Sequence, residues 1–421
     1  MKLLYLISFV ALLSSCQKNY EAPLPSLDWS LFQDPAALRL LPATVRAAEG
    51  VYALSEGSDF FGARMALKSS YVLDGTDTVY HLSFLGEREI PWIILEGRRL
   101  GDSILLNGYW RRMINTSTGR VRLVIPAANG AALLLNPQGP LPVDGVRIRG
   151  LFGNGSEVPL QRLELSYQRP LNPGNFDILA HRSGGRTSDL LPYSENSVNM
   201  IRFAAQMGAT GIEIDVRLTR DGVPILYHDN TLNLRLIQKN GLVGPIEEYS
   251  YDQLYRQVRL LDGQRIPSLR EALYALVYET DLRTVWLDTK YDGPLDRVQA
   301  LQAEFRQRAA QIGRQVDIYI GLPTEDAFDR FKALPNFSNT PSLCELSVDQ
   351  VNEINAAVWA PRWTLGLQNA EVSAVRASGK KVYVWTLDVP EYARQFVNEG
   401  QFNGILTNYP SLIAYYHYVK Q

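Results

Sequence analysis

Short apolar segments alternate with amphipathic segments throughout the second half of the chain. Buried strands are expected at residues 176–180, 211–216, 284–288, 316–320, 342–346, 356–360, 381–386 and 404–407. Helices are expected between them at 194–207, 268–278, 295–312, 324–334, 369–378 and 390–399, and Ser268 and Glu271 have the spacing of a capping box. Eight strands alternating with helices predict a (β/α)8 TIM barrel, in which functional residues lie at the carboxyl ends of the strands.

The first half of the chain has a different pattern, in which short alternating runs are separated by turn residues. The runs are 63–73, 78–85, 91–100, 103–114, 120–126, 131–136, 145–153 and 159–168. Asp74-Gly75, Gly101-Asp102, Thr118-Gly119, Asn129-Gly130, Asp144-Gly145 and Asn154-Gly155 are the turn signals. This pattern predicts an all-β antiparallel barrel or sandwich, which as a closed barrel could hold a ligand. We expect an accessory or binding domain, and its position in the chain suggests that it helps to cover the functional residues expected at the strand ends of the second half.

The breaks in these patterns predict the domain boundaries. Arg169-Pro170-Leu171-Asn172-Pro173-Gly174 interrupts both periodicities and is typical of a linker. We therefore expect a processing signal at 1–16, a tether at 17–45, the β-rich domain at 46–170 and the α/β barrel at 175–421.

The N-terminus has the features of an export signal. Lys2 precedes an apolar run from Leu3 to Leu13 that is too short to span a bilayer, and Leu13-Ser14-Ser15-Cys16 follows. This stretch resembles a bacterial lipoprotein signal, which implies cleavage before Cys16 and acylation of that cysteine. We therefore expect the chain to be exported and lipid-anchored to a bacterial membrane, at the outer membrane or the cell surface. Cys344 is the other cysteine, so a lipidated chain forms no internal disulfide.

Composition limits the partners of this chain. Its 421 residues are 46% hydrophobic, which is enough for more than one core. The formal net charge is -2, so no global field attracts nucleic acid. The sequence leaves the oligomeric state open. Because overall charge indicates no partner, the function must be inferred from local groups of titratable side chains.

Residues 178–229 contain such a group. In the run Gly-Ile-Glu-Ile-Asp-Val, Glu213 and Asp215 point to the same side of a strand. Two carboxylates in an apolar element are unfavourable unless a cation or hydrogen-bond donors compensate. His181 and His228, two of only four histidines in the chain, end two other apolar runs. The combination predicts a metal site at the mouth of the barrel.

These motifs resemble those of the glycerophosphodiester phosphodiesterase family, which has a TIM-barrel fold and hydrolyses phosphodiesters with a bound divalent metal. The resemblance covers residues 176–415. It depends on His181-Arg182, Glu195-Asn196-Ser197, Glu213-x-Asp215, His228-Asp229, and the closing segments Val-Trp-Thr-Leu-Asp and Gly-Ile-Leu-Thr-Asn-Tyr-Pro. It implies that His181 and His228 are the general acid and base, that Glu213 and Asp215 hold the metal, and that Arg182 contacts phosphate.

Four further residues complete the expected site. The family's Glu-x-Lys motif corresponds here to Asp288 and Lys290, which implies that Asp288 is a third metal ligand and that Lys290 reaches the phosphate. Glu195 is expected to orient substrate or join the metal shell, and Trp385 to line the pocket or to pack in the core. Carboxylate ligands favour one hard divalent cation, Ca²⁺ or Mg²⁺.

The predicted function is metal-dependent hydrolysis of small-molecule phosphodiesters, most simply of glycerophosphodiesters to glycerol phosphate and an alcohol. One alternative keeps the same site but acts, as a phospholipase does, on lipid or lysolipid phosphodiesters. A second alternative is a non-catalytic binding or adhesion lipoprotein, because a fold alone does not fix function. The full set of histidines, arginine and carboxylates favours an enzyme.

Overall fold

A computed structural model describes residues 20–421 of the chain. The expected signal segment and Cys16 lie outside the described residues, so the prediction of a lipid anchor stands as a prediction. Across residues 20–421, no helix is both long and apolar enough to cross a bilayer.

The second half of the chain folds into a closed parallel barrel, as predicted. Its strands are β10 (Asp177–Ala180), β11 (Gly211–Leu218), β15 (Thr284–Thr289), β16 (Asp317–Leu322), β17 (Ser342–Cys344), β18 (Val358–Trp359), β19 (Lys381–Val384) and β20 (Gly404–Thr407). The barrel closes because β10 pairs in parallel with both β11 and β20. Its interior is filled by buried side chains that include Leu179, Trp286, Tyr319, Leu343, Tyr383 and Leu406.

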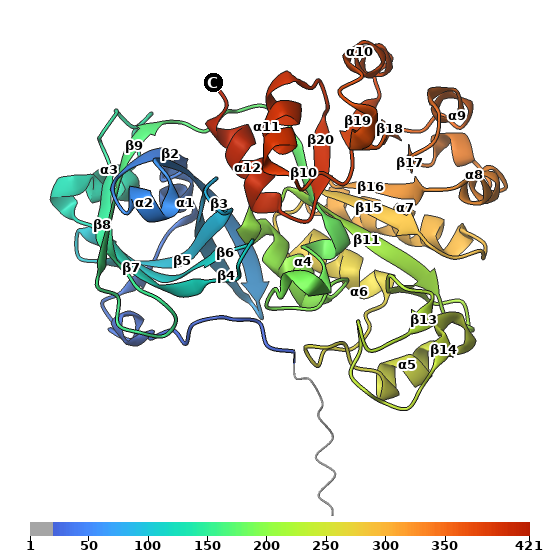
Figure 1. Ribbon diagram of the computed structural model, residues 1–421, viewed down its shortest axis with the longest axis horizontal. Coiled ribbons are helices and arrows are strands. Elements are labelled where there is room, and N and C mark those ends of the chain that lie inside the picture. The colour runs from blue at the N-terminus through green and yellow to red at the C-terminus, as the bar shows by residue number, and fades with distance from the viewer. Residues whose placement is uncertain (1–19) are drawn as a thin grey trace, which may run out of the picture.

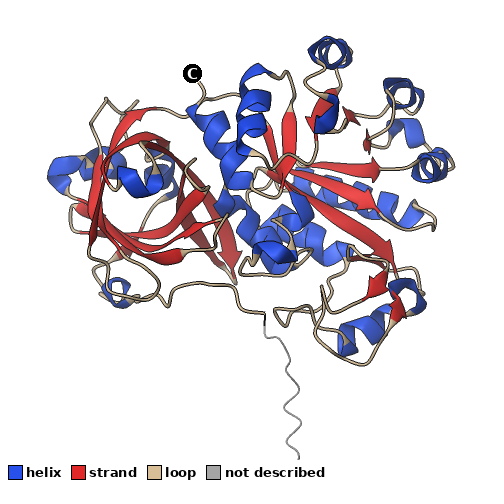
Figure 2. Ribbon diagram, in the orientation of Figure 1, coloured by secondary structure: helices blue, strands red, loops and turns tan. Residues whose placement is uncertain are grey.

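Helices cover the outside of this barrel (Figures 1 and 2). They are α4 (Val198–Ala204), α6 (Leu269–Tyr274), α7 (Asp296–Gln311), α8 (Glu325–Lys332), α9 (Val348–Glu353), α10 (Asn369–Ala377), α11 (Pro390–Glu399) and α12 (Pro410–Val419). The capping box is confirmed: the Ser268 hydroxyl accepts from the Glu271 backbone N–H, and the Glu271 carboxylate accepts from the Ser268 backbone N–H. Helices α9 and α12 were not among the expected elements.

A small insertion follows β11 and precedes α6. It contains β12 (Pro224–Leu226), which pairs antiparallel with β11, a two-stranded ribbon of β13 (Thr231–Leu232) and β14 (Gly244–Pro245), and α5 (Tyr251–Gln257). The segment between Asp229 and Ser250, in which no strand or helix was expected, therefore carries a short ribbon.

The first half of the chain is a closed antiparallel barrel, which confirms the predicted class. Its strands are β2 (Gly50–Glu56), β3 (Arg64–Asp74), β4 (Asp77–Leu85), β5 (Pro91–Leu100), β6 (Ser103–Arg112), β7 (Thr118–Ile125), β8 (Arg147–Phe152) and β9 (Gln161–Arg169). Strand β2 pairs with β9 to close it, and β1 (Leu38–Arg39) adds at β5. Helices α1 (Pro42–Ala47) and α2 (Ser58–Phe61) contribute Val45 and Phe61 to the buried apolar side chains of this domain.

Three details of the predicted pattern were wrong. The run 131–136 is helix α3 (Ala131–Leu135), since alanine and leucine are strong helix formers and the run has no β-branched residue. The eighth strand is instead β2, which the pattern had not marked. Thr118-Gly119 is no turn but lies in β7, where a Cβ on Gly119 would meet the Gly153 carbonyl oxygen at 1.8 Å.

The two barrels lie side by side and share one apolar interface (Figure 1). Alternate residues of β5 face opposite ways: Ile93 packs inside the antiparallel barrel, whereas Trp92 belongs to the core of the α/β domain. The Trp92 ring lies edge-on to Phe203 at the end of α4, with 5.8 Å between centroids. Helix α12 also contacts β3 and β4. The antiparallel barrel is therefore packed against the α/β barrel through a continuous core.

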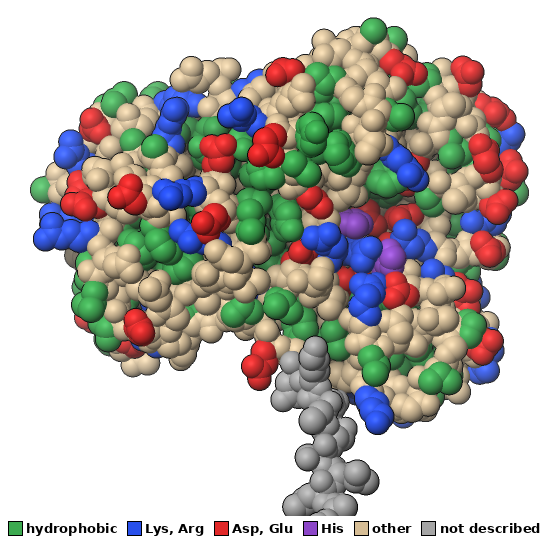
Figure 3. All heavy atoms as spheres, in the orientation of Figure 1, with side chains coloured by type: hydrophobic (Ala, Val, Ile, Leu, Met, Phe, Trp, Pro, Cys, Tyr) green, Lys and Arg blue, Asp and Glu red, His purple; other side chains and the backbone are tan. Residues whose placement is uncertain are grey.

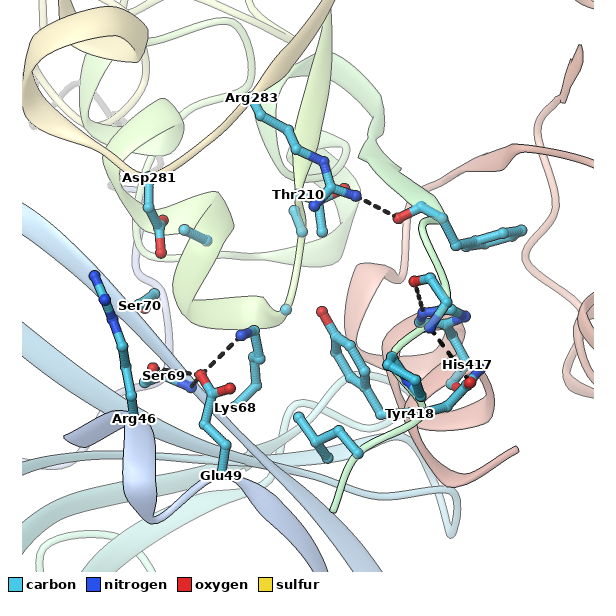
Figure 4. Close-up of a pocket in the computed structure, with 18 of the residues that line it drawn as sticks. Arg46, Glu49, Lys68, Ser69, Ser70, Thr210, Asp281, Arg283, His417 and Tyr418 are labelled. Atoms are coloured by element: carbon cyan, nitrogen blue, oxygen red, sulfur yellow. Dashed lines mark hydrogen bonds and ion pairs between the residues drawn. The ribbon is translucent and has the colours of Figure 1, made fainter. Parts of the chain in front are cut away.

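A cavity of about 480 Å³ lies in this interface (Figure 4). It is lined by Lys68 and Glu49, which form an ion pair at 2.7 Å, and by Thr210, Arg283 and Tyr418. Thr210 and Arg283 immediately precede β11 and β15, so the cavity lies at the amino ends of the strands. Because reactive sites of such barrels lie at the carboxyl ends, this cavity is separate from the site described next.

Candidate functional site

Three carboxylates meet at the carboxyl ends of two neighbouring strands. Asp215 of β11 is paired in register with Asp288 of β15, and Glu213 lies two residues before Asp215 on the same side. One ligand oxygen from each of the three lies within 4.8 Å of the other two. In Figure 3, histidine side chains are visible at a hollow where acidic and basic side chains gather. The strand alternation predicted from sequence thus brings these three acids together.

These carboxylates are poorly compensated by the protein. Glu213 and Asp215 are 1% and 0% exposed, and Glu213 Oε1, Asp215 Oδ1 and Asp288 Oδ1 are buried without a hydrogen-bond partner. Burial and the charges of Asp215 and Asp288 raise the pKa of Glu213 well above its ordinary value. Burial likewise raises the pKa of Asp288. Burial opposes ionisation of Asp215 too, but Lys290, the two histidines and Arg182 outweigh it and lower the pKa of Asp215.

Lys290 supplies part of the missing positive charge. Its Nζ lies 2.5 Å from Asp288 Oδ2 and 3.3 Å from Asp215 Oδ1. These neighbouring acids raise the pKa of Lys290 although its burial opposes this. One ammonium does not balance three carboxylates, and unpartnered acidic oxygens remain. The donor set of carboxylate oxygens therefore fits a hard divalent cation, Ca²⁺ or Mg²⁺, better than zinc.

His181 follows β10 at the edge of this cluster. Its Nδ1 lies 2.8 Å from Asn408 Oδ1 after β20, and the Asn408 amide is oriented because its Nδ2 donates to Asp388 Oδ2. An amide oxygen only accepts, so His181 Nδ1 carries the hydrogen and Nε2 has a free lone pair. That Nε2 lies 3.8 Å from Glu213 Oε2. Burial and the charge of Arg182 lower the pKa of His181 to about 4.

His228 faces the same cavity from the end of β12. Its Nδ1 lies 2.6 Å from Asp229 Oδ1, and its Nε2 lies 2.9 Å from an N–H group of Arg182. A guanidinium only donates, so the Nε2 of the neutral ring is the acceptor and Nδ1 donates to Asp229. Both histidines therefore share one tautomer, in which Nδ1 carries the hydrogen and Nε2 does not.

Arg182 connects His228 with the acids. Its backbone N–H donates to Glu213 Oε2 at 2.8 Å, and its guanidinium donates to Glu195 Oε1 at 3.0 Å. The residue has φ = 52°, a left-handed conformation that turns the chain sharply after β10. This turn places the backbone and the side chain of one residue in the same site.

Glu195 belongs to the support of Arg182 and not to the carboxylate cluster. Glu195 is 2% exposed. Its Oε2 accepts from the Thr187 backbone N–H at 2.7 Å, and the Arg235 guanidinium donates to both carboxylate oxygens at 3.3 Å. Thus the structure places Glu195 next to the arginine expected to contact phosphate.

Trp385 lies just beyond β19 at the same end of the barrel. Its Nε1 donates to the Ala360 carbonyl at 2.8 Å, and the Arg362 guanidinium stacks 4.8 Å from the ring centroid. Its position at the barrel mouth is compatible with a pocket wall, and its contact with substrate stays a prediction.

Several supporting residues were missed as members of the site. Asn196 Nδ2 donates to Asp215 Oδ2 at 2.7 Å, and Asn196 Oδ1 accepts from the Asp215 backbone N–H. Asn408 and Asp388 orient His181, and Asp229 orients His228. All four stand inside the motifs that carried the resemblance, but sequence spacing gave no sign of what they touch. Arg235 lay outside every motif.

Known proteins share this part of the chain. A model of the glycerophosphoryl diester phosphodiesterase family matches residues 181–412, more than half of the chain. Rat glycerophosphodiester phosphodiesterase 1 is 37% identical over 107 residues, 23% of this chain and 28% of the rat protein. The probable glycerophosphodiester phosphodiesterase 2 of Mycobacterium tuberculosis is 40% identical over 106 residues, which are 25% of this chain and 37% of that protein. The chain thus spans less than two fifths of either relative.

A solved phosphodiesterase structure also aligns with part of this chain. The Oleispira antarctica phosphodiesterase in complex with the product sn-glycerol-3-phosphate is 20% identical, with a TM-score of 0.43. The match covers 56% of this chain and 94% of that one.

Proposed function

Because this chain belongs to the glycerophosphoryl diester phosphodiesterase family, we propose that it hydrolyses glycerophosphodiesters to glycerol phosphate and an alcohol with the help of a divalent cation. The single observation that supports this most is the convergence of two histidines, one arginine and three carboxylates at one barrel mouth. A site that had lost its reaction has no physical reason to keep the two histidines and Arg182 beside buried, unpartnered carboxylate oxygens. The geometry therefore favours an enzyme over a lipoprotein that only binds.

The cation would be held by Glu213, Asp215 and Asp288. A bound Ca²⁺ or Mg²⁺ would supply positive charge that polarises the phosphoryl group. The fit is based on three buried acidic oxygens that lack hydrogen-bond partners. Asn196 supports it by donating to one Asp215 oxygen, which leaves the other without a hydrogen bond and with only the Lys290 ammonium nearby at 3.3 Å. Lys290, already close to two of the acids, lies where it would meet the anionic substrate.

The histidines would carry the two proton transfers. His181 is neutral at physiological pH, since its pKa is lowered to about 4, so its Nε2 would accept the proton of the attacking hydroxyl group, which belongs either to water or to the glycerol moiety of the substrate. As the hydroxyl oxygen bonds to phosphorus, the bond from phosphorus to the alcohol oxygen breaks. His228 would take up a proton at Nε2 from solvent once the Arg182 guanidinium donates to the phosphoryl oxygens instead, and it would give that proton to the departing alkoxide. Where the attacking hydroxyl is that of the glycerol moiety, a water molecule would then open the cyclic phosphate. Arg182 would bind the phosphoryl oxygens with its planar guanidinium.

Substrate choice provides the test of this function. We expect the purified protein to release choline from glycerophosphocholine faster than from lysophosphatidylcholine, and EDTA to abolish the release until Ca²⁺ or Mg²⁺ is restored. Faster turnover of lysophosphatidylcholine would indicate the phospholipase-type alternative. No turnover of either compound or of a generic phosphodiester, with the protein folded and the cation present, would contradict the proposal.

We further propose that the mature chain is exported and attached to a bacterial membrane through acylated Cys16. The support is the basic, apolar and Leu13-Ser14-Ser15-Cys16 segments in their order. We expect radiolabelled palmitate to enter the protein and the protein to sediment with membranes in a bacterial host. Cys16→Ser should abolish both, whereas Cys344→Ser should change neither. Equal labelling of Cys16→Ser and wild-type protein would contradict the anchor.

A further inference from the structure

The loop that borders the active site is bonded to the antiparallel barrel as well as to the catalytic residues. We define the rim loop as residues 183–193, between β10 and α4. Within it, Arg186 donates to the Asp189 carboxylate through its backbone and its guanidinium, which fixes the loop's shape. The Thr187 backbone N–H donates to Glu195, whose other oxygen accepts from Arg182. The conformation of the loop therefore bears on the orientation of Arg182.

Arg111 of β6 reaches this loop from the antiparallel barrel. Its guanidinium donates to the Asp189 carbonyl oxygen at 2.8 Å and to the Pro23 carbonyl oxygen at 3.4 Å. The residue is 0% exposed, Nε has no partner, and no carboxylate pairs with it in the part of the chain that the structure describes. Burying an arginine whose only acceptors are carbonyl oxygens costs free energy of desolvation. An apolar side chain would fill the same space without that cost, so packing alone does not explain the arginine.

The first described residues bind the same loop. Tyr20 Oη donates to the Leu191 carbonyl oxygen at 2.5 Å, and Pro23 accepts from Arg111. The N-terminal segment thus lies against both β6 and the rim loop. Two independent contacts hold one face of the loop, and both come from residues before the linker.

We propose that Arg111 is a positioning residue, through which the antiparallel barrel holds the rim loop and, by way of Thr187 and Glu195, keeps Arg182 oriented toward the phosphate of the substrate. This inference rests on the proposed function, because it assigns to the first domain a part in that reaction. It replaces the looser expectation that this domain covers the site. The Asp189 carbonyl oxygen accepts the hydrogen bond from Arg111, and Glu195 links the rim loop to Arg182 by accepting from both.

Arg112 offers a matched control on the same strand. Its guanidinium pairs with Glu89 at 2.8 Å, donates to the Phe60 carbonyl oxygen and stacks on the Phe60 ring, so its contacts stay within the first domain. Arg111→Met and Arg112→Met remove the same chemical group from adjacent positions. Only the first change breaks the contact with the rim loop.

The first measurement is amide hydrogen exchange in the full chain without substrate. Arg111→Met should raise exchange at least tenfold in residues 183–193, whereas Arg112→Met should leave that segment as in wild type. This readout does not need activity, so it separates a failure of the inference from a failure of the proposed function. Unchanged exchange of the rim loop in Arg111→Met would overturn the inference.

The second measurement is steady-state kinetics on glycerophosphocholine. Arg111→Met should lower kcat/KM by about 10 to 100-fold, with most of the change in KM, while the Kd for Ca²⁺ stays within twofold of wild type. Glu195→Gln combined with Arg111→Met should lose little more than Glu195→Gln alone, because both act along one chain of contacts. Wild-type kcat/KM in Arg111→Met, or fully additive losses, would contradict the connection to catalysis. If Arg111→Met does not fold, Arg111→Lys provides the same test with an intermediate loss expected.

Discussion

His181→Ala should lower kcat by about 10²- to 10⁴-fold, which is the range that a general acid or base contributes. The reason is the geometry of the ring: Asn408 fixes the hydrogen on Nδ1, so Nε2 is free to take a proton from the attacking hydroxyl. His228→Ala should cause a loss of similar size, because it removes the proton donor for the leaving alkoxide. Steady-state assays on glycerophosphocholine at saturating Ca²⁺ or Mg²⁺ measure both.

His81→Ala is the matched control for these variants. His81 is 8% exposed and lies in β4 of the antiparallel barrel, so its removal should lower stability but leave kcat of the folded protein unchanged. Asn408→Ala should reduce kcat less than His181→Ala. It removes the acceptor that keeps the hydrogen of His181 on Nδ1, but it leaves the imidazole base in place. Full activity in either catalytic-histidine variant would contradict the assigned proton transfers.

Asp215→Asn should abolish cation-dependent activity, the second large effect that we expect. The change keeps the size of the side chain and removes the charge at the residue that lies between Asn196, Lys290 and the other acids. Isothermal titration should show Ca²⁺ binding weakened more than 100-fold, since loss of an outer-shell partner alone typically costs 10 to 100-fold. Glu247→Gln, which removes a surface acid paired with Arg217, should bind the ion as wild type does.

Removing a charge from this cluster should change the stability of the folded protein differently with and without the cation. Burial and neighbouring charges raise the pKa of Glu213, so ionisation of this group destabilises the folded state, and stability is lost as pH rises through the raised pKa. In EDTA, the unfolding temperature of wild type should therefore fall more as pH rises than that of Glu213→Gln, which has no carboxyl group to ionise at this position. In excess Ca²⁺, Glu213→Gln should unfold at a lower temperature than wild type. At a given pH, an equal difference between the two proteins in both buffers would show that the acids do not bind the ion.

The fold of the α/β barrel was predictable because its strands are buried on both faces. Each of the eight apolar runs became a strand, as expected for a parallel sheet covered by helices. The run 131–136 was misassigned because an apolar segment of that length is compatible with either a strand or a helix, and only packing decides between them. The short strand β12 was recognised as a run ending at His228, but its antiparallel pairing with β11 had no local signal.

The parts of the site that depend on the alternation of side chains along one strand were predictable. The parts that depend on hydrogen-bond partners from distant segments of the chain were not. Glu213 and Asp215, like Asp288 and Lys290, are two residues apart and therefore face one side. Asn408 reaches His181 across 227 residues, and Arg111 reaches Asp189 across 78. Nothing in the sequence near a β-strand arginine indicates that it will support a loop of another domain. Such contacts require the folded chain.

The central claim is that Glu213, Asp215 and Asp288 hold one divalent cation at the barrel mouth. Anomalous diffraction from crystals soaked in Mn²⁺, which oxygen-rich sites accept, tests it most directly. We predict one strong peak within about 2.6 Å of an oxygen from each of the three carboxylates, near the upper end of the bond lengths seen for hard cations. A peak elsewhere, or no peak at these carboxylates in crystals that bind the ion, would contradict it.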